Sequence, residues 1–284
     1  MSGALKRMPV ISVLWGLGLL TTISLSMLWS GTVADGLARN GIQAASMTAI
    51  AEAAVSRAVI GLFDPRPERR WRADNVPQDF EFDGVPIKVS IQDELGRIDI
   101  NQAEVSALVS LLKSVGLDLN SATGLADKIL DWRTATTLKH LNGAKEADYA
   151  AVGSAYRPRN GPFQSIDELL LVMGMTAEIF RRIEPAVTVY SGRQFVDPQI
   201  APREVLLSLL NMTPQNVEAA LAARAGRAVS TELPSIDRIA SLRGRAFRIR
   251  AEIVRANRSY VYEAYVRLTD NPLQPYWLMS WRAT

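Results

Sequence analysis

The sequence contains no cysteine and a single histidine, His140. Without cysteine, the chain can form no disulfide, bind no metal through thiolates and offer no thiol nucleophile. One histidine cannot form a histidine metal cluster and leaves a Ser-His-Asp arrangement only one candidate base, which lies in the polar stretch TTLKHLNGAK. The G-x-S-x-G, phosphate-loop and H-E-x-x-H motifs are also absent. These absences predict that the protein is not an enzyme and that His140 is a solvated loop residue.

Neither sign of charge dominates the chain. Its 32 Lys and Arg residues and 29 Asp and Glu residues leave a formal net charge of +3. So small a surplus, spread along the sequence, is not the electrostatic footprint of a nucleic-acid-binding protein. With 284 residues and 48% hydrophobic content, the chain is long enough for one large or two modest cores.

The N-terminal region is a long uncharged run. No charged residue occurs between Arg7 and Asp35, whereas about 20 apolar residues suffice for a helix to cross a bilayer. The basic pair Lys6-Arg7 precedes the run, which favours a cytoplasmic N-terminus. We therefore expect a short cytoplasmic leader at 1–9 and a transmembrane anchor helix at 10–31.

A cleaved secretory signal is the alternative interpretation of this run. Thr32-Val33-Ala34 offers a small-residue cleavage site. The apolar core of a signal peptide usually spans only 7–15 residues, however. The greater length of the run favours the anchor.

The pattern after the anchor is first helical and then alternating. Residues 32–63 are rich in alanine and free of proline, which predicts that the helix continues beyond the membrane. Residues 64–84 carry proline and charge and are predicted to form a loop. Apolar and polar residues then alternate, which predicts half-buried strands at 85–94, 247–254, 259–268 and 275–282.

Between these strands the period changes to that of a helix. Three segments, 101–132, 165–183 and 202–224, each read as a helix, a short turn and a second helix. The sequence therefore predicts an α+β fold. A sheet domain formed by 64–98 and 246–284 is interrupted by an all-helical subdomain of helical hairpins at 99–245.

Several segments, taken in order, resemble the minor pseudopilin K family of type II secretion systems. They are ISVLWGLGLL, DELGRIDINQAEVSALVSLL, ILDW, SIDELLLVMGM, IAPREVLLSLL and the closing WR. The resemblance implies a pilin-like fold, with a long N-terminal helix packed on an antiparallel sheet.

The same resemblance implies a function in protein secretion. It implies a protein at the tip of the secretion pseudopilus that initiates pseudopilus assembly with minor pseudopilins I and J. Other pseudopilins and the inner-membrane assembly platform would be further partners, and the filament would export folded proteins across the outer membrane. The expected location is the bacterial inner membrane, with a single span and a periplasmic main domain.

Two positions near the N-terminus depart from the pattern of this family. The resemblance places prepilin-peptidase cleavage between Arg7 and Met8, but Arg7 stands where the family has glycine. Counted from Met8, the fifth residue is Ser12, where most pseudopilins carry a glutamate that can neutralise a neighbouring N-terminal amine in the bilayer. Because Ser12 cannot ionise, we expect one copy at the end of the filament rather than a repeating subunit.

The resemblance also points to a calcium loop, although its ligands are depleted here. The candidate ligands are Asp131, Glu146 and Asp148, while Thr134, Thr136 and Lys145 occupy positions where relatives carry carboxylates. Calcium takes 6–8 oxygen ligands, so the prediction is that no cofactor is bound. Hydrogen bonds and the packing of Trp132 against Tyr149 would then hold the loop.

The alternative function is a membrane-anchored DNA-binding or DNA-uptake protein, because SIDELLLVMGMTAEIF resembles a helix-hairpin-helix module. Such modules hold phosphate with main-chain N–H groups, usually at a Gly-x-Gly turn. Here Gly174 is followed by Met175 and Thr176. The missing phosphate cradle favours a protein that binds no nucleic acid.

Overall fold

The computed structural model describes residues 8–66, 69–210, 212–226, 242–255 and 258–283. The chain divides into two compact units, residues 1–52 and 53–284. Helix α1 (Met8–Leu62) begins in the first unit and ends in the second. Most of the predicted leader, including Arg7 at the expected cleavage point, lies outside the described residues.

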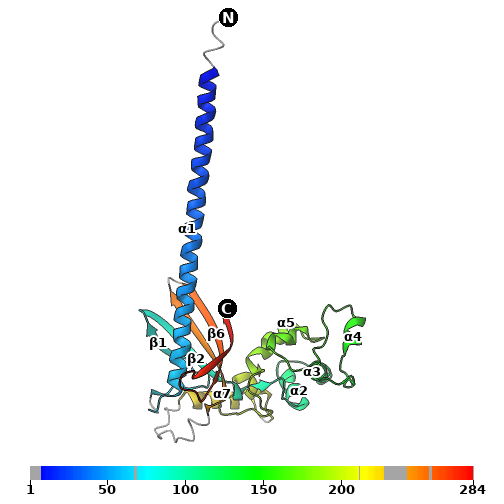
Figure 1. Cartoon of the computed structure of the whole chain (residues 1–284). Helices are drawn as coiled ribbons and strands as arrows, with labels where there is room; N and C mark the ends of the chain where they lie inside the picture. The colour runs from blue at the N-terminus through cyan, green and yellow to red at the C-terminus, as the bar shows by residue number, and fades with distance from the viewer. Residues whose placement is uncertain (1–7, 67–68, 211, 227–241, 256–257, 284) are drawn as a thin grey trace. The chain divides into compact units, whose positions relative to one another are not determined.

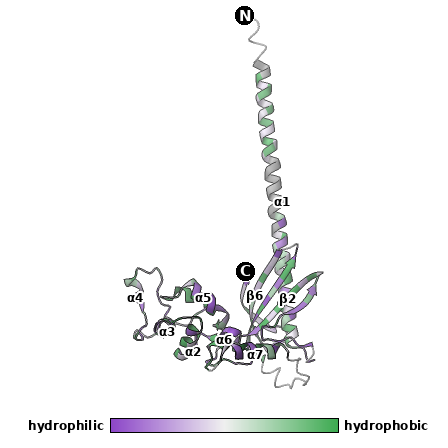
Figure 2. Cartoon of the chain, turned by 180° about the vertical axis from the view of Figure 1, so that it is seen from behind, coloured by the Kyte–Doolittle hydropathy of each residue, from purple (hydrophilic) through white to green (hydrophobic). Residues whose placement is uncertain are grey.

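In the first unit, α1 is one uninterrupted helix with an apolar surface (Figure 2). Leu14, Leu17 and Leu20 are each more than half exposed. The hydroxyl groups of Thr21 and Thr22 each donate a hydrogen bond to a main-chain carbonyl of the preceding turn, at 2.8 Å. This stretch therefore presents apolar side chains to its surroundings and keeps its polar hydroxyls satisfied within the helix, as a lipid environment requires.

Among the described residues, one helical stretch, Gly41–Leu62, is long and apolar enough to cross a membrane, and half of it is buried inside the protein. The described part of the predicted anchor includes the shorter apolar helical segment Ile11–Ser26. Burial of half of a helix is typical of a protein core, whereas most of the exposed large apolar residues described in α1 lie on Ile11–Ser26.

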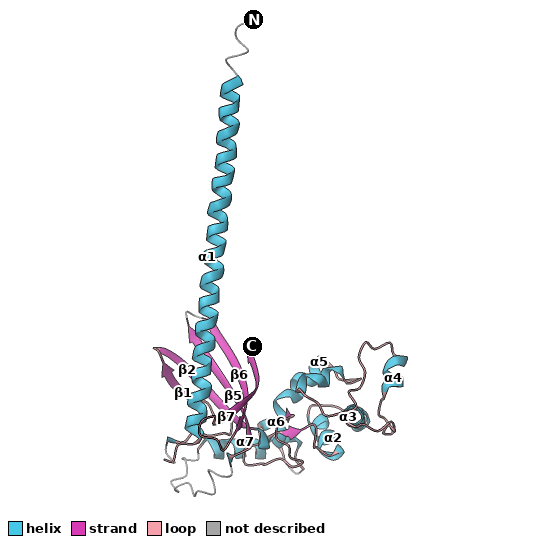
Figure 3. Ribbon diagram, viewed as in Figure 1, coloured by secondary structure: helices cyan, strands magenta, loops and turns pink. Residues whose placement is uncertain are grey.

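The second unit contains a five-stranded antiparallel sheet (Figure 3). Its strands lie in the order β1 (Gln78–Phe82), β2 (Val85–Asp93), β5 (Ala246–Arg255), β6 (Arg258–Leu268) and β7 (Tyr276–Ala283). The alternating sequence pattern predicts four of these strands. The prediction of a loop throughout 64–84 is wrong for β1, which pairs with β2 across a tight turn.

The register of β2 and β5 brings their apolar residues to one face. Ile87, Val89 and Ile91 lie opposite Ile253, Ala251 and Ile249, and all six are buried. The end of α1, from residue 53 onward, lies beside this sheet (Figure 1). Its small and branched side chains are buried there, namely Ala54, Val55, Ala58, Val59 and Leu62. Arg248 and Arg250 of β5 are half-buried on the other face, as the alternation predicts.

The chain between β2 and β5 is mainly helical. It contains α2 (Val105–Ser114), α3 (Leu119–Arg133), α4 (Glu146–Ala151), α5 (Ala177–Ile183), α6 (Arg203–Ser208) and α7 (Pro214–Ala225). It also contains the 3-10 helices η2 (Glu94–Gly96), η3 (Ile166–Leu171) and η4 (Glu184–Ala186) and a parallel pair of two-residue strands, β3 (Ile98–Asp99) and β4 (Val187–Thr188). The prediction of an entirely α-helical segment at 99–245 therefore needs correction, because β3 at its start pairs with β4 in its interior.

A separate hydrophobic core holds this helical region together. Its buried members come from all parts of the region, from Ile98 before α2 to Val217 in α7. Trp132 stacks on Phe163 with ring centroids 6.1 Å apart and lies 5.9 Å from Tyr149. The predicted packing of Trp132 against Tyr149 is present, so the loop after α3 is fixed at both ends to a shared aromatic core.

Candidate functional site

The loop from Thr134 to Lys145, which follows α3 and leads into α4, contains or adjoins all the candidate ligands. Asp131 is fully buried at the end of α3. Its carboxylate accepts the main-chain N–H of His140 at 3.2 Å and lies 2.7 Å from the Nδ1 atom of the same residue. A carboxylate only accepts hydrogen bonds, so Nδ1 carries the hydrogen in this contact. The prediction that His140 is simply solvated misses this bond.

The other two candidate carboxylates have partners of their own. Asp148 accepts the main-chain N–H of Lys145 at 2.9 Å and the ammonium of Lys139 at 2.6 Å. The hydrogen bond from Lys139 is the main cause that lowers the pKa of Asp148. Glu146 pairs with Arg157 at 2.6 Å, and both side chains are exposed. Asp148 and Glu146 are thus each paired with a different basic side chain.

These contacts do not make a calcium site. Within the part of the chain that the structure describes, no three acidic or histidine side chains gather closely enough to hold a metal ion. Asp131 is buried and contacts His140, whereas Glu146 is exposed and pairs with Arg157. The donor set does not fit the 6–8 oxygen ligands of calcium, so no step in the function is assigned to that ion.

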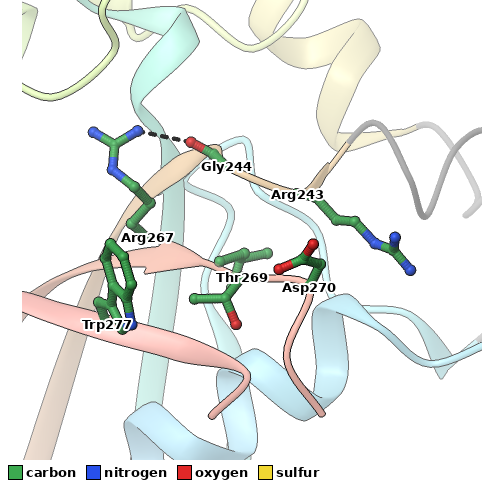
Figure 4. Close-up of a pocket in the computed structure, with 7 residues that line it drawn as sticks. Arg243, Gly244, Arg267, Thr269, Asp270 and Trp277 are labelled. Atoms are coloured by element: carbon green, nitrogen blue, oxygen red, sulfur yellow. Dashed lines mark hydrogen bonds between the residues drawn. The ribbon is translucent and has the colours of Figure 1, made fainter.

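A second neighbourhood with chemically active side chains lies where β6 and β7 meet. A pocket of about 400 Å³ there is lined by Arg243, Gly244, Arg267, Leu268, Thr269, Asp270 and Trp277, whose side chains are drawn in Figure 4. Arg267 is already bound to the carbonyl oxygens of Gly244 and Tyr190, at 2.7 and 2.9 Å. The Thr269 hydroxyl is bound to the carbonyl of Gln274. The pocket therefore supplies structural hydrogen bonds rather than a nucleophile paired with a base.

The predicted helix-hairpin-helix segment folds into η3, a turn at Gly174 and α5. In a nucleic-acid site, the guanidinium of Arg182 would be a candidate to bind a phosphate group. Its guanidinium instead binds the carbonyl of Val115 at 2.9 Å and the carboxylate of Glu178 at 2.5 Å. The geometry adds nothing in favour of the nucleic-acid alternative.

Comparison with known protein families bears on the helical region. The family model described as "Type II secretion system (T2SS), protein K" matches residues 89–192. This match begins within β2, includes the Thr134–Lys145 loop and ends just after β4. We name residues 89–192, the segment that matches this family model, the protein K domain.

Curated relatives carry the same name. The chain is 34% identical over 77 residues to type II secretion system protein K of Pectobacterium carotovorum subsp. carotovorum, which is 27% of this chain and 24% of the relative. It is 31% identical over 104 residues to the protein K of Aeromonas hydrophila, covering 36% of this chain and 31% of the relative. The aligned part thus spans only about a quarter to a third of the curated relatives.

The similarity of fold extends well beyond the protein K domain. A chain in the crystal structure of the GspK-GspI-GspJ complex from the enterotoxigenic Escherichia coli type 2 secretion system matches with a TM-score of 0.61. The match covers 87% of this chain and 98% of that chain, at 14% sequence identity. At this identity the comparison supports the fold. The shared fold is a mixed helix and sheet architecture with an antiparallel sheet.

The helical region between β2 and β5 is tied to the sheet by contacts that the sequence patterns do not identify. Gln92 at the end of β2 donates to the carbonyl of Ile200 at 2.8 Å. Gly96 lies so close to this carbonyl that a β-carbon would be 2.4 Å from its oxygen. Tyr190 beyond β4 packs against Tyr265 of β6 with ring centroids 4.9 Å apart. These long-range contacts join the helical region to β2 and β6.

Proposed function

We propose that this protein is a minor pseudopilin K of a type II secretion system. The observation that carries the proposal is the protein K domain at residues 89–192, which begins within β2 of an antiparallel sheet and follows a long N-terminal helix. Its task is mechanical: it assembles with other proteins and catalyses no reaction. Energy for movement would come from a cytoplasmic ATPase elsewhere in the secretion machine.

The N-terminal helix is the membrane anchor in this proposal. Residues 10–31 cross the bacterial inner membrane once, with residues 1–9 in the cytoplasm and 32–63 extending the helix into the periplasm. The exposed apolar surface between Ile11 and Ser26 supports this assignment, as do the basic residues that precede it.

The periplasmic part consists of a pilin-like sheet domain, 64–98 and 246–284, and a helical subdomain, 99–245, inserted into it. The pairing of β2 with β5 supports this division, because the chain leaves and re-enters the sheet at neighbouring strands. A bulky insertion is difficult to repeat along a closely packed filament. Together with Ser12 at the position of the usual glutamate, it supports a single copy at the tip of the pseudopilus.

The partners in this proposal are minor pseudopilins I and J. The solved complex with a similar fold is described as containing GspK, GspI and GspJ. By analogy, this chain forms a ternary tip with its own I and J proteins and initiates assembly of the pseudopilus on the inner-membrane platform. The completed filament promotes export of folded proteins across the outer membrane.

Co-expression tests the proposal directly. Tagged full-length chain is produced with the I and J proteins of the same organism, extracted in detergent and purified through the tag. The expected result is a complex of all three proteins on size exclusion, whereas a tagged single-span protein of unrelated sequence captures neither. Recovery of the full-length chain as a dissolved cytoplasmic protein, without I or J, would contradict it.

A further inference from the structure

We propose that the ammonium group of Lys145 is a built-in cation, which organises the Thr134–Lys145 loop in the way that a bound metal ion would. The residue types that could serve calcium are depleted here, and the carboxylates that remain do not converge. A positive charge is nevertheless present among oxygen atoms. It belongs to the protein itself.

Three oxygen atoms surround the ammonium. Lys145 Nζ lies 2.6 Å from the carbonyl oxygen of Asp131, 2.7 Å from that of Thr134 and 3.3 Å from Oδ1 of Asn160. A lysine ammonium has three hydrogens to donate and accepts none. The number of acceptors therefore matches the number of donor hydrogens, and the ammonium joins the end of α3 to Asn160.

Two of these oxygens belong to the C-terminal end of α3. Asp131 lies in its last turn, and Thr134 is its C-cap residue. The last carbonyls of a helix have no partner within it and carry the negative end of the helix dipole. A cation is favoured at this position, and Lys145 provides one from 11 residues beyond Thr134.

The neighbouring carboxylate is not available to an added metal ion. Asp131 is occupied by His140, as described above, and its Oδ2 atom lies against Gly143, where a β-carbon would be only 1.8 Å away. The nearby Asp148 is occupied by Lys139 and by the main chain of Lys145. A metal ion would have to displace the ammonium and also break these hydrogen bonds.

The inference gives two expectations for thermal unfolding of the purified full-length chain in detergent. First, the wild type unfolds at the same temperature in excess EDTA and in millimolar calcium, because a ligand that does not bind the folded state does not stabilise it. Second, Lys145→Met lowers the melting temperature by roughly 5 °C in both buffers, as expected when charged hydrogen bonds are lost from a protein of this size. Lys113→Met is the matched control, since Lys113 is exposed at the end of α2, and it should leave the melting temperature unchanged.

Terbium luminescence gives a second readout that does not depend on the melting temperature of a variant. The buried Trp132 next to Asp131 can sensitise a lanthanide held at the loop. Wild-type protein should give no sensitised emission, whereas Lys145→Asp, which removes the ammonium and adds a carboxylate, should gain emission that calcium competes away. Sensitised terbium emission or calcium-dependent stabilisation in the wild type would overturn the inference. So would a Lys145→Met protein as stable as wild type.

Discussion

The guanidinium of Arg97 contacts both carboxylate oxygens of Glu94, at 3.2 Å each, and both side chains are fully inaccessible to solvent. Arg97 also donates to the carbonyls of Glu184 and Pro185, at 2.5 and 3.0 Å. One buried residue therefore joins the turn after β2 to the turn before β4. Hydrogen bonds satisfy the pair on several sides, which is the condition under which burial of two charges is tolerated.

We expect Arg97→Met to lower the free energy of unfolding by about 3–5 kcal/mol, because it leaves the Glu94 carboxylate buried without its partner. Chemical denaturation of the full-length protein in detergent measures the change. Glu94→Gln provides the other single variant, and the double variant should cost less than the sum of the two. Additive losses would mean that the two side chains stabilise the protein independently of each other.

A pH dependence follows from Asp93, the last residue of β2. Burial raises the pKa of this carboxyl to about 6, against the opposing charge of Arg245. The folded protein thus retains the proton at pH values where the unfolded chain, with a pKa near 3.8, has lost it. The contribution of Asp93 to the free energy of unfolding is greatest below pH 4 and falls by roughly 3 kcal/mol as the pH rises to 6.

Asp93→Asn is the variant that tests this pH dependence, since the amide oxygen can still accept the N–H of Leu95, as Asp93 does at 2.9 Å. Its free energy of unfolding should lack the decrease between pH 4 and pH 6 that the wild type shows. Denaturation curves across this range provide the comparison. An identical slope in both proteins would assign the pH dependence to other groups.

Gly143 is expected to be intolerant of any side chain. Its β-carbon would overlap Oδ2 of Asp131, and moving this carboxylate breaks the contacts with His140. Gly143→Ala should lower the free energy of unfolding by about 1–3 kcal/mol. The control is Gly124→Ala within α3, where the nearest atom to a new β-carbon is 3.7 Å away. It should be neutral or stabilise the helix by up to about 1 kcal/mol.

Leu19 tests the membrane anchor because it lies in the middle of the exposed apolar segment and is 61% exposed. An arginine at the centre of a spanning helix costs about 2.5–3.5 kcal/mol in insertion. We expect Leu19→Arg to reduce the fraction of the chain that resists alkaline extraction from membranes, and Leu19→Met to leave it unchanged. Equal extraction of both variants would place the anchoring surface elsewhere.

The two-residue alternation of apolar and polar residues predicts those strands that are long enough for the alternation to repeat. Strands β2, β5, β6 and β7 each have eight or more residues, and the burial of β2 and β5 alternates over most of their length. Strand β1 has only five residues, of which two are aromatic and two acidic, so its signal is lost in the charged stretch before it. Strands β3 and β4 have two residues each and no detectable period.

In the segment Ile166–Leu171 the sequence correctly predicts a helix but not its type. The sequence predicts an α-helix there, yet it forms the 3-10 helix η3. Ile166, Leu169 and Val172 are all buried, and their spacing of three residues is the period of a 3-10 helix rather than of an α-helix. An apolar run as dense as SIDELLLVM supports both periods, so only packing selects one.

The loop after α3 marks the limit of inference from residue types. The sequence identifies Asp131, Glu146 and Asp148 and shows that the carboxylates are too few for calcium. It cannot show that Lys145 turns inward onto the end of α3, because this contact depends on the path of the loop. Nor does it reveal the Arg97–Glu94 pair, whose burial depends on residues about 90 positions further along.

The pairing of Asp93 with Phe247 at the end of the β2–β5 ladder has a consequence for how such a chain can change. Opposed residues of antiparallel strands are only about 4.5–5.5 Å apart, so the chain leaves the sheet and returns to it at two adjacent points. A tight turn could connect these two strand ends directly. We therefore expect that the helical region can be lengthened or shortened without breaking the hydrogen bonds between β2 and β5.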